Sequence, residues 1–170
     1  VGVANNIDVA MVIDRSGSMS GEGIIAARNA GSLFVESMEF DDAISVISFE
    51  SSAHNDFDLA VINTQQVKTD AQATINALTT AGSTNMGAGL EYGVNQLLTS
   101  STNSPQFIIL LSDGEANSDA DVYNILPSIS SNSITTLFKD NEGNLWVGTF
   151  KAGLNKLLID LKRKFRLFTI

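Results

Sequence analysis

An apolar run that breaks into a short polar loop constrains the fold of this chain more than any other stretch. Residues Val9–Ile13 have the composition of a buried β-strand, and the loop DRSGS follows them at once. This loop carries one carboxylate and two hydroxyl groups at alternate positions, on Asp14, Ser16 and Ser18. Hard oxygen donors on one short loop suit a hard divalent cation. The stretch therefore predicts a strand that ends in a cation site.

Two further motifs accompany this loop, and together they resemble a known family. Asp14-x-Ser16-x-Ser18 after an apolar strand resembles the DxSxS signature that opens the metal-ion-dependent adhesion site of von Willebrand factor A domains. Residues 82–85, GSTN, resemble the threonine loop of that family, and residues 110–114, LLSDG, resemble its aspartate loop. The resemblance covers roughly residues 5–126. It implies that a divalent cation is held by Asp14, Ser16, Ser18, Thr84 and Asp113.

The resemblance also implies a binding chemistry. Magnesium is the expected cation, with manganese or calcium as alternatives, because Mg²⁺ takes six oxygen ligands and keeps several waters. Neutral hydroxyls leave much of the cation's charge unquenched, so the remaining position attracts a carboxylate from an Asp or Glu of a protein partner. In the structural alternative, Ser16 and Ser18 cap the following helix and Asp113 caps another.

Apolar periodicity along the chain predicts the fold class. The expected order is strand 9–14, helix 20–38, strand 43–49, edge strand 53–59, helix 67–78, helix 86–97, central strand 107–111, short helix 119–126 ended by Pro127, and strand 134–138. Alternating strands and helices indicate an α/β domain with a doubly wound, mainly parallel, Rossmann-like sheet and helices on both faces. Ligand sites in such sheets lie at the carboxyl ends of strands, where Asp14 and Asp113 both fall.

The C-terminal residues differ from this pattern. Residues 140–149, DNEGNLWVGT, and 153–157, GLNKL, resemble one repeat of the two-component-regulator β-propellers. We therefore expect a vWA-like domain over residues 1–132, shorter than the family pattern, and a propeller-repeat-like segment over residues 133–170. A single repeat cannot close a propeller, so this segment should pack on or complete the vWA sheet as an added β-hairpin. The apolar residues between 157 and 168 are also spaced as on one face of a helix. Of these two alternatives, helix and hairpin, the hairpin is favoured. Any surplus strand would pair with a second copy, giving a homodimer.

Charge and composition narrow the partners. The net charge is −9, with basic residues concentrated after residue 150, and the acidic body argues against nucleic acid as the partner. No apolar run is long enough for a membrane span. The start resembles no signal peptide, so any export signal is expected outside this sequence, and an extracellular or cell-surface location is expected. There is no cysteine, which excludes disulfides.

Three functions remain to be compared. A metal-dependent protein-binding module is the favoured one, and it is not an enzyme. A metal-dependent hydrolase is less favoured, because no G-x-S-x-G elbow occurs and the single histidine, His54, lies in none of the motifs. A sensory or structural segment dominated by the propeller-like tail is the other alternative. Glu115 and Asn85 adjoin the expected ligands and are candidates for supporting contacts.

Overall fold

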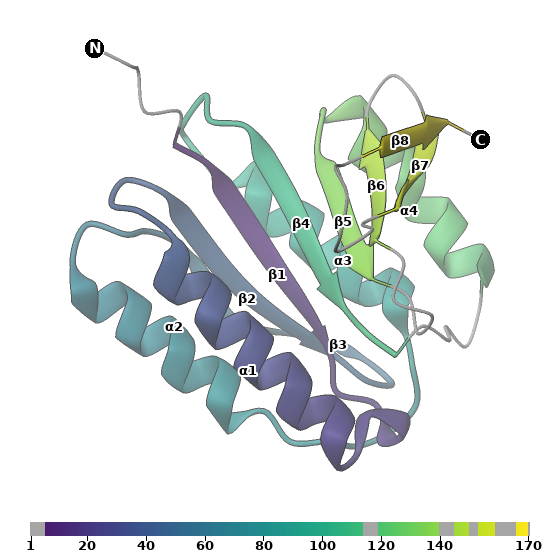
Figure 1. The fold of residues 1–170 in the computed structure, drawn as a ribbon, viewed down its shortest axis with the longest axis horizontal. Helices are drawn as coiled ribbons and strands as arrows, with labels where there is room; N and C mark the ends of the chain where they lie inside the picture. The colour runs from purple at the N-terminus through teal and green to yellow at the C-terminus, as the bar shows by residue number, and fades with distance from the viewer. Residues whose placement is uncertain (1–5, 114–118, 140–144, 150–152, 159–165, 170) are drawn as a thin grey trace.

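Alternating strands and helices build one sheet with two helical layers (Figure 1). A computed structural model describes residues 6–113, 119–139, 145–149, 153–158 and 166–169. The elements in these ranges are β1 (Asp8–Asp14), the 3-10 turn η1 (Gly17–Met19), α1 (Glu22–Ser37), β2 (Ala43–Phe49), β3 (Ala53–Val61), α2 (Gln65–Ala77), α3 (Met86–Leu98), β4 (Gln106–Leu111), α4 (Asp119–Ser131), β5 (Thr135–Lys139), β6 (Leu145–Thr149), β7 (Gly153–Leu158) and β8 (Arg166–Thr169).

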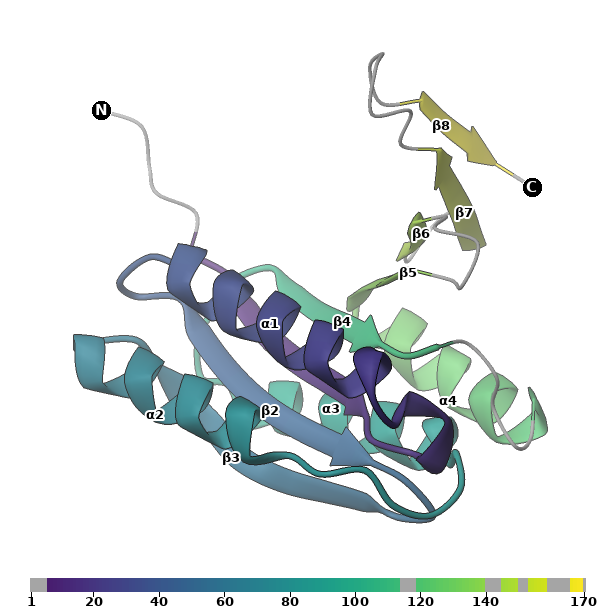
Figure 2. The ribbon, with the colours of Figure 1, turned by 60° about the horizontal axis from the view of Figure 1, so that its bottom comes forward.

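The sheet has the topology that the alternating pattern predicts. Its described strands lie in the order β3-β2-β1-β4-β5-β6-β7-β8. The strands β2, β1, β4 and β5 run parallel, and β3 is an antiparallel edge. Figure 2 shows α1 and α2 on one face and α3 and α4 on the other. The predicted fold class, a mainly parallel doubly wound sheet with helices on both faces, is confirmed.

The central strand β1 is fully buried because it contributes to two separate cores. Val9, Met11 and Ile13 point into the core beneath α1 and α2, whereas Ala10 and Val12 point into the core beneath α3 and α4. All five side chains are inaccessible to solvent. A strand without a solvent-facing side reads as a continuous apolar run rather than an alternation. This explains why the sequence of β1 was the clearest strand signal in the chain.

The strand β4 is central, but only one of its faces is well covered. Ile108 and Leu110 are buried against α3 and α4. Phe107, Ile109 and Leu111 stay half-buried on the opposite face. The helices α1 and α2 lie over β1, β2 and β3 instead (Figure 2). The side chains on this face still pack against the core beneath α1 and α2, so both faces of the strand are covered, but only partly on the α1 side.

The helix α4 continues past Pro127, which was expected to end it. Pro127 lies inside the helix, which ends only at Ser131. Ile129 is 6% exposed and packs in the core beneath α3 and α4, so burial of the last turn favours helix beyond the proline. Backbone N–H groups of residues 132 and 134 also donate to carbonyls of the last turn, at 3.2 and 3.1 Å. Packing here outweighs the loss of one helical hydrogen bond.

The C-terminal strands extend the sheet. Strand β5 pairs in parallel with β4, so the prediction that residues 134–138 join the edge beyond residues 107–111 is confirmed. Strands β6, β7 and β8 follow in antiparallel order, and β7 pairs with β8 as the favoured hairpin requires. In Figure 2 these three strands lie away from the two helical layers. The division of the chain at residue 132 stays a prediction.

Candidate metal centre

The register of the sheet brings two of the sequence motifs together. Ile13 of β1 is paired with Leu111 of β4, so the next residues, Asp14 at the end of β1 and Ser112 just after β4, lie side by side. The hydroxyl of Ser112 donates to Asp14 Oδ2 at 2.7 Å. Asp113 is the next residue and is half-buried. The structure thus places the aspartate loop beside the DxSxS loop, as the parallel topology predicts.

Asp14 is a buried carboxylate surrounded by hydroxyl groups. Its side chain is 0% exposed, and its Oδ1 atom accepts the backbone N–H of Ser16 at 2.8 Å. Ser16 is 1% exposed, and its Oγ lies 3.1 Å from the Oγ of Ser18, which is exposed. The two hydroxyls therefore lie on the same side of the loop, with Ser18 at the solvent boundary.

Backbone hydrogen bonds tie the loop that carries Thr84 to the DxSxS loop. The N–H of Ala81 donates to the carbonyl of Arg15 at 2.8 Å, and the N–H of Gly17 donates to the carbonyl of Gly82 at 3.1 Å. Thr84 is 8% exposed. Gly82 has a φ of 64°, and a Cβ there would lie 2.3 Å from Glu50 Oε2, so glycine is strongly favoured at this position. The two loops therefore form one connected rim at the carboxyl edge.

The capping interpretation of the two serines is wrong. Ser16 occupies the N-cap position of η1, but its side chain makes no capping hydrogen bond. The N-cap residue of α1 is Gly21, and no side-chain hydrogen bond caps this helix. The residues between Asp113 and Asp119 lie outside the described residues, so the capping alternative for Asp113 stays open. The hydroxyls of Ser16 and Ser18 thus remain available as ligands at the end of β1.

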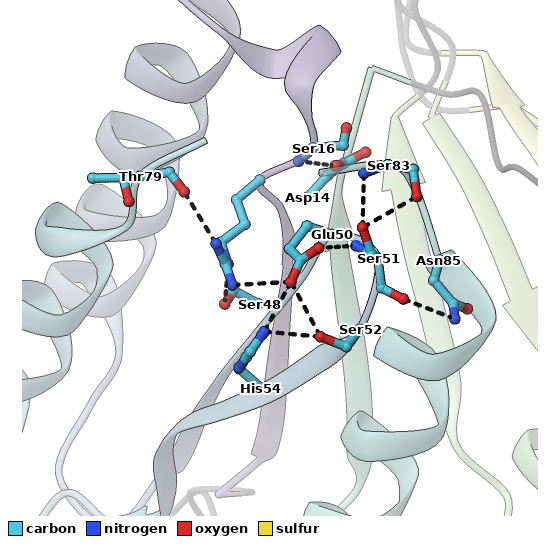
Figure 3. A network of polar contacts seen from close by, with 11 residues as sticks. Asp14, Ser16, Ser48, Glu50, Ser51, Ser52, His54, Thr79, Ser83 and Asn85 are labelled. Carbon is cyan, nitrogen blue, oxygen red and sulfur yellow. Dashed lines mark hydrogen bonds and ion pairs between the residues drawn. The ribbon is translucent and has the colours of Figure 1, made fainter. Parts of the chain in front are cut away.

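A charged pair lies beside this rim (Figure 3). The guanidinium of Arg15 lies 3.5 Å from Glu50 Oε1, and its Nε donates to Ser48 Oγ at 3.2 Å. Hydrogen bonds lower the pKa of Glu50 from 4.5 to about 2; the largest contribution comes from the Ser51 side chain, followed by the Ser51 backbone, His54 and Ser52. The described side-chain contacts of Arg15 thus go to Glu50, Ser48 and the carbonyl of Thr79 rather than to Asp14.

His54 is an exposed residue of β3, as expected, but it belongs to this polar cluster. Its Nε2 atom lies 3.2 Å from Ser52 Oγ and 3.2 Å from Glu50 Oε1 (Figure 3). A catalytic serine–histidine–acid relay uses both ring nitrogens, one for the serine and the other for the carboxylate. Here one nitrogen makes both contacts. This trio is therefore not arranged for nucleophilic catalysis.

Sequence reasoning missed two contributors to the site, Ser112 and Glu50. Ser112 lies within the LLSDG motif, and the parallel pairing of its strand with the strand of Asp14 was the signal that could have identified it. Glu50 opens a run of oxygen-bearing residues, ESS, at the carboxyl end of β2.

Asn85, a candidate for a supporting contact, caps α3 by accepting the N–H of Ala88. Glu115 lies outside the described residues.

The candidate ligand set is poor in carboxylates. Among the described residues, no group of three or more His, Cys, Asp or Glu side chains is placed to hold a metal ion. Asp14 and Asp113 are the two carboxylates of the set, and the other members, Ser16, Ser18 and Thr84, are hydroxyls. Three of the five candidate ligands are therefore neutral oxygen donors.

A Rossmann-like α/β domain with hydroxyls and carboxylates at the carboxyl edge of its central strands is the class that this fold defines. A family model for the von Willebrand factor type A domain matches residues 8–138, and the chain belongs to this family. A second model, the two component regulator propeller, matches residues 128–151. No helix in the described part of the chain has the length and apolarity needed to cross a membrane.

Relatives and solved structures agree with this family. An uncharacterized protein of Synechocystis sp. (strain ATCC 27184 / PCC 6803 / Kazusa) is 29% identical over 143 residues, covering 82% of this chain and 33% of that protein. The vWF domain of the type V pili tip protein Mfa5 from Porphyromonas gingivalis is 30% identical with a TM-score of 0.59, covering 68% of this chain and 40% of that chain. The von Willebrand factor type A structure from Catenulispora acidiphila has a TM-score of 0.70 and 23% identity, covering 80% of this chain and 33% of that one. The chain spans a third or less of the curated relatives it matches.

Proposed function

We propose that this domain is an adhesion-type binding module that captures a carboxylate of a protein partner on a divalent cation. Asp14, Ser16, Ser18, Thr84 and Asp113 would hold the cation at the carboxyl edge of β1 and β4. Magnesium is the proposed cation, with manganese or calcium as alternatives. When bound, the cation supplies an electrophilic centre that attracts an outside Asp or Glu side chain.

One observation carries this proposal, the burial of Asp14 without a positive partner. Its side chain is 0% exposed, and none of the ion pairs among the described residues involves it. A buried charge is unfavourable unless it is paired or coordinates a metal. The nearest arginine in the chain, Arg15, is bound to Glu50 instead. A cation bound at this edge of the sheet would compensate the buried negative charge of Asp14.

The donors present fit a hard cation. Each carboxylate oxygen of Asp14 accepts one hydrogen bond, from Ser16 or from Ser112, and a carboxylate oxygen can accept more than one. The neighbouring candidates are hydroxyls, which are neutral oxygen ligands suited to Mg²⁺. A binding role is also favoured over a catalytic one. Ser52, His54 and Glu50, which lie nearby, do not form a catalytic relay.

The relatives support an adhesive role at the cell surface. One matched structure is the vWF domain of a type V pili tip protein, at 30% identity. We propose by this analogy that the present domain acts outside the cell and recognises a protein. Pairing of two copies through the C-terminal strands is part of the same proposal, because β8 is the outermost described strand of the sheet.

The test uses Asp14→Asn, which removes the charge and keeps the shape of the side chain. We expect Mg²⁺ and Mn²⁺ to raise the melting temperature of the wild-type chain relative to a chelator, because a ligand that binds only the folded state stabilises it. The melting temperature of Asp14→Asn should not respond to either metal. Differential scanning calorimetry with EDTA, Mg²⁺ or Mn²⁺ gives this comparison.

The matched control is Asp56→Asn, which removes one charge from an exposed position of β3. It should respond to metal as the wild-type chain does. Identical melting curves for the wild-type chain in EDTA and in millimolar Mn²⁺ would contradict the proposal. So would an Asp14→Asn protein that retains the full metal response.

A further inference from the structure

We propose that Arg15 and Glu50 are positioning residues of the metal site, whose ion pair holds the DxSxS loop against the loop that carries Thr84. This inference rests on the proposed cation site and deepens it. Arg15 lies between two candidate ligands, Asp14 and Ser16, yet its side chain contacts none of the five proposed ligands in the described contacts. Its contacts go instead to the ends of β2 and α2.

The guanidinium of Arg15 joins three separate segments. Its terminal nitrogen lies 3.5 Å from Glu50 Oε1, its Nε donates to Ser48 Oγ at 3.2 Å, and its other terminal nitrogen donates to the carbonyl of Thr79 at 3.4 Å. A planar guanidinium with donors in a fixed fork can hold several acceptors at once. Figure 3 labels the three partners, Thr79, Ser48 and Glu50, and marks their contacts with dashed lines. The side chain thus connects the DxSxS loop to β2 and to the segment that leads to Thr84.

Glu50 completes the connection from the other side. Its backbone carbonyl accepts the N–H of Asn85, the residue after Thr84, at 2.6 Å. The next residue, Ser51, accepts the N–H of Ser83 through its Oγ at 3.1 Å. Residues on both sides of Thr84 are therefore bonded to the Glu50–Ser51 corner. That corner is held to the DxSxS loop by Arg15.

Charge gives the pair a second role. Arg15 follows Asp14 directly, so an unpaired guanidinium there could compete with a cation for the Asp14 carboxylate. Glu50 carries a full negative charge at neutral pH and keeps Arg15 on the far side of the loop. Loss of either partner should therefore weaken cation binding, although neither residue is a proposed ligand.

The experiment measures Mn²⁺ affinity directly, by the EPR signal of free Mn²⁺, in wild type, Arg15→Gln, Glu50→Gln and the double variant. Groups that support metal ligands typically change affinity by about 10–100-fold. We expect each single variant to raise the Kd for Mn²⁺ about tenfold. The double variant should lose little more than either single one, because both remove the same connection. Asp56→Asn, the charge-matched control, should keep the wild-type Kd.

A second measurement needs no metal. Hydrogen exchange of the Gly17 and Ala81 amides reports the two backbone bonds that join the loops. We expect faster exchange at both amides in Arg15→Gln and Glu50→Gln, while amides of the buried strand β1 exchange as in the wild-type chain. Unchanged exchange at Gly17 and Ala81 would overturn the positioning role. A loss of protection throughout β1 would also overturn it, because it would show a general effect on folding.

Arg15→Lys separates geometry from charge. Lysine keeps the positive charge but cannot hold three acceptors in one plane, so we expect its Kd for Mn²⁺ to stay well above the wild-type value. Wild-type affinity in Arg15→Lys, or in both Arg15→Gln and Glu50→Gln, would overturn this inference while leaving the proposed function intact. Failure of the wild-type chain to bind Mn²⁺ would instead overturn the proposed function, and the inference with it.

Discussion

At the level of single residues, hydrogen bonding to Glu50 has an effect that can be measured without any metal. The side chain accepts hydrogen bonds from Ser51, Ser52 and His54, and its pKa falls from 4.5 to about 2. A carboxyl group with a lowered pKa in the folded state stabilises the fold at pH values above its unfolded pKa. That contribution disappears as the pH falls through the range between the two pKa values.

We therefore predict a pH-dependent difference in stability between the wild-type chain and Glu50→Gln. The difference in the free energy of unfolding should shrink as the pH falls from 4.5 towards 2. Glutamine cannot ionise, so it lacks this dependence. Urea unfolding of both proteins at a series of pH values measures the difference. A difference that stays constant down to pH 3 would show that Glu50 has an ordinary pKa.

How well single residues could be predicted depended on whether their signal was local. Asp14 and Ser16 were identifiable because a strand and its loop are continuous in sequence. Ser112 and Glu50 were missed, because their contacts with Asp14 and Arg15 cross between strands and exist only once the sheet register is known. The positions of these residues along the sequence do not show which side chains at the ends of different strands come into contact.

At the level of elements, two glycines of α3 lie where any side chain would collide with the sheet. A Cβ at Gly89 would lie 2.5 Å from Cδ1 of Phe49, and one at Gly93 would lie 2.9 Å from Cγ2 of Val12. Gly89 and Gly93 therefore allow α3 to approach the sheet. Gly87 faces α4 instead, because a Cβ there would lie 2.7 Å from the backbone of Asp121.

Gly89→Ala should therefore destabilise the fold even though alanine is the better helix former. Phe49 is 0% exposed and cannot move aside, and overpacking of this kind costs about 1–3 kcal/mol. The matched control is Gly23→Ala in α1, where a Cβ would lie at an ordinary 3.5 Å from Met19 Sδ. That change should be neutral or stabilise the fold by about 0.5 kcal/mol. Urea unfolding compares the two variants, and equal effects would contradict the close approach of α3.

Element boundaries could be predicted where one apolar pattern dominated. The strand at residues 43–49 was predicted with the observed limits because its residues are buried throughout. The helix α4 was predicted too short, because local rules place a stop at Pro127 and give no weight to the burial of Ile129. The end of that helix depends on contacts with the sheet, which the sequence pattern alone does not contain.

At the level of the whole molecule, the candidate site and the C-terminal strands lie in different parts of the sheet. The proposed ligands lie at the ends of β1 and β4 and in the loop before α3. Strands β6, β7 and β8 pair only with one another and with β5 among the described strands. Removal of residues 140–170 should therefore affect the stability of the sheet more than the cation site.

We predict that a chain ending at residue 139 binds Mn²⁺ with the Kd of the full chain but melts at a lower temperature. Without β6, strand β5 becomes an open edge with unpaired backbone groups, which favours self-association. Calorimetry, light scattering and the Mn²⁺ titration give the three readouts. A truncated protein that is monomeric and as stable as the full chain would show that these strands contribute nothing to the fold.

The close approach of α3 to the sheet also has a consequence for the proposed cation site, which lies away from the glycines that allow it. Thr84 lies just before α3, and Asn85 fixes the first turn by accepting the N–H of Ala88. The distance of the helix from the sheet depends on the absence of side chains at Gly89 and Gly93, and Thr84 precedes this helix directly. A methyl group added at Gly89 or Gly93 would therefore shift Thr84, a proposed ligand, without touching it. If the proposed cation site is correct, such a change inside the core would alter its preference among ions of different radius.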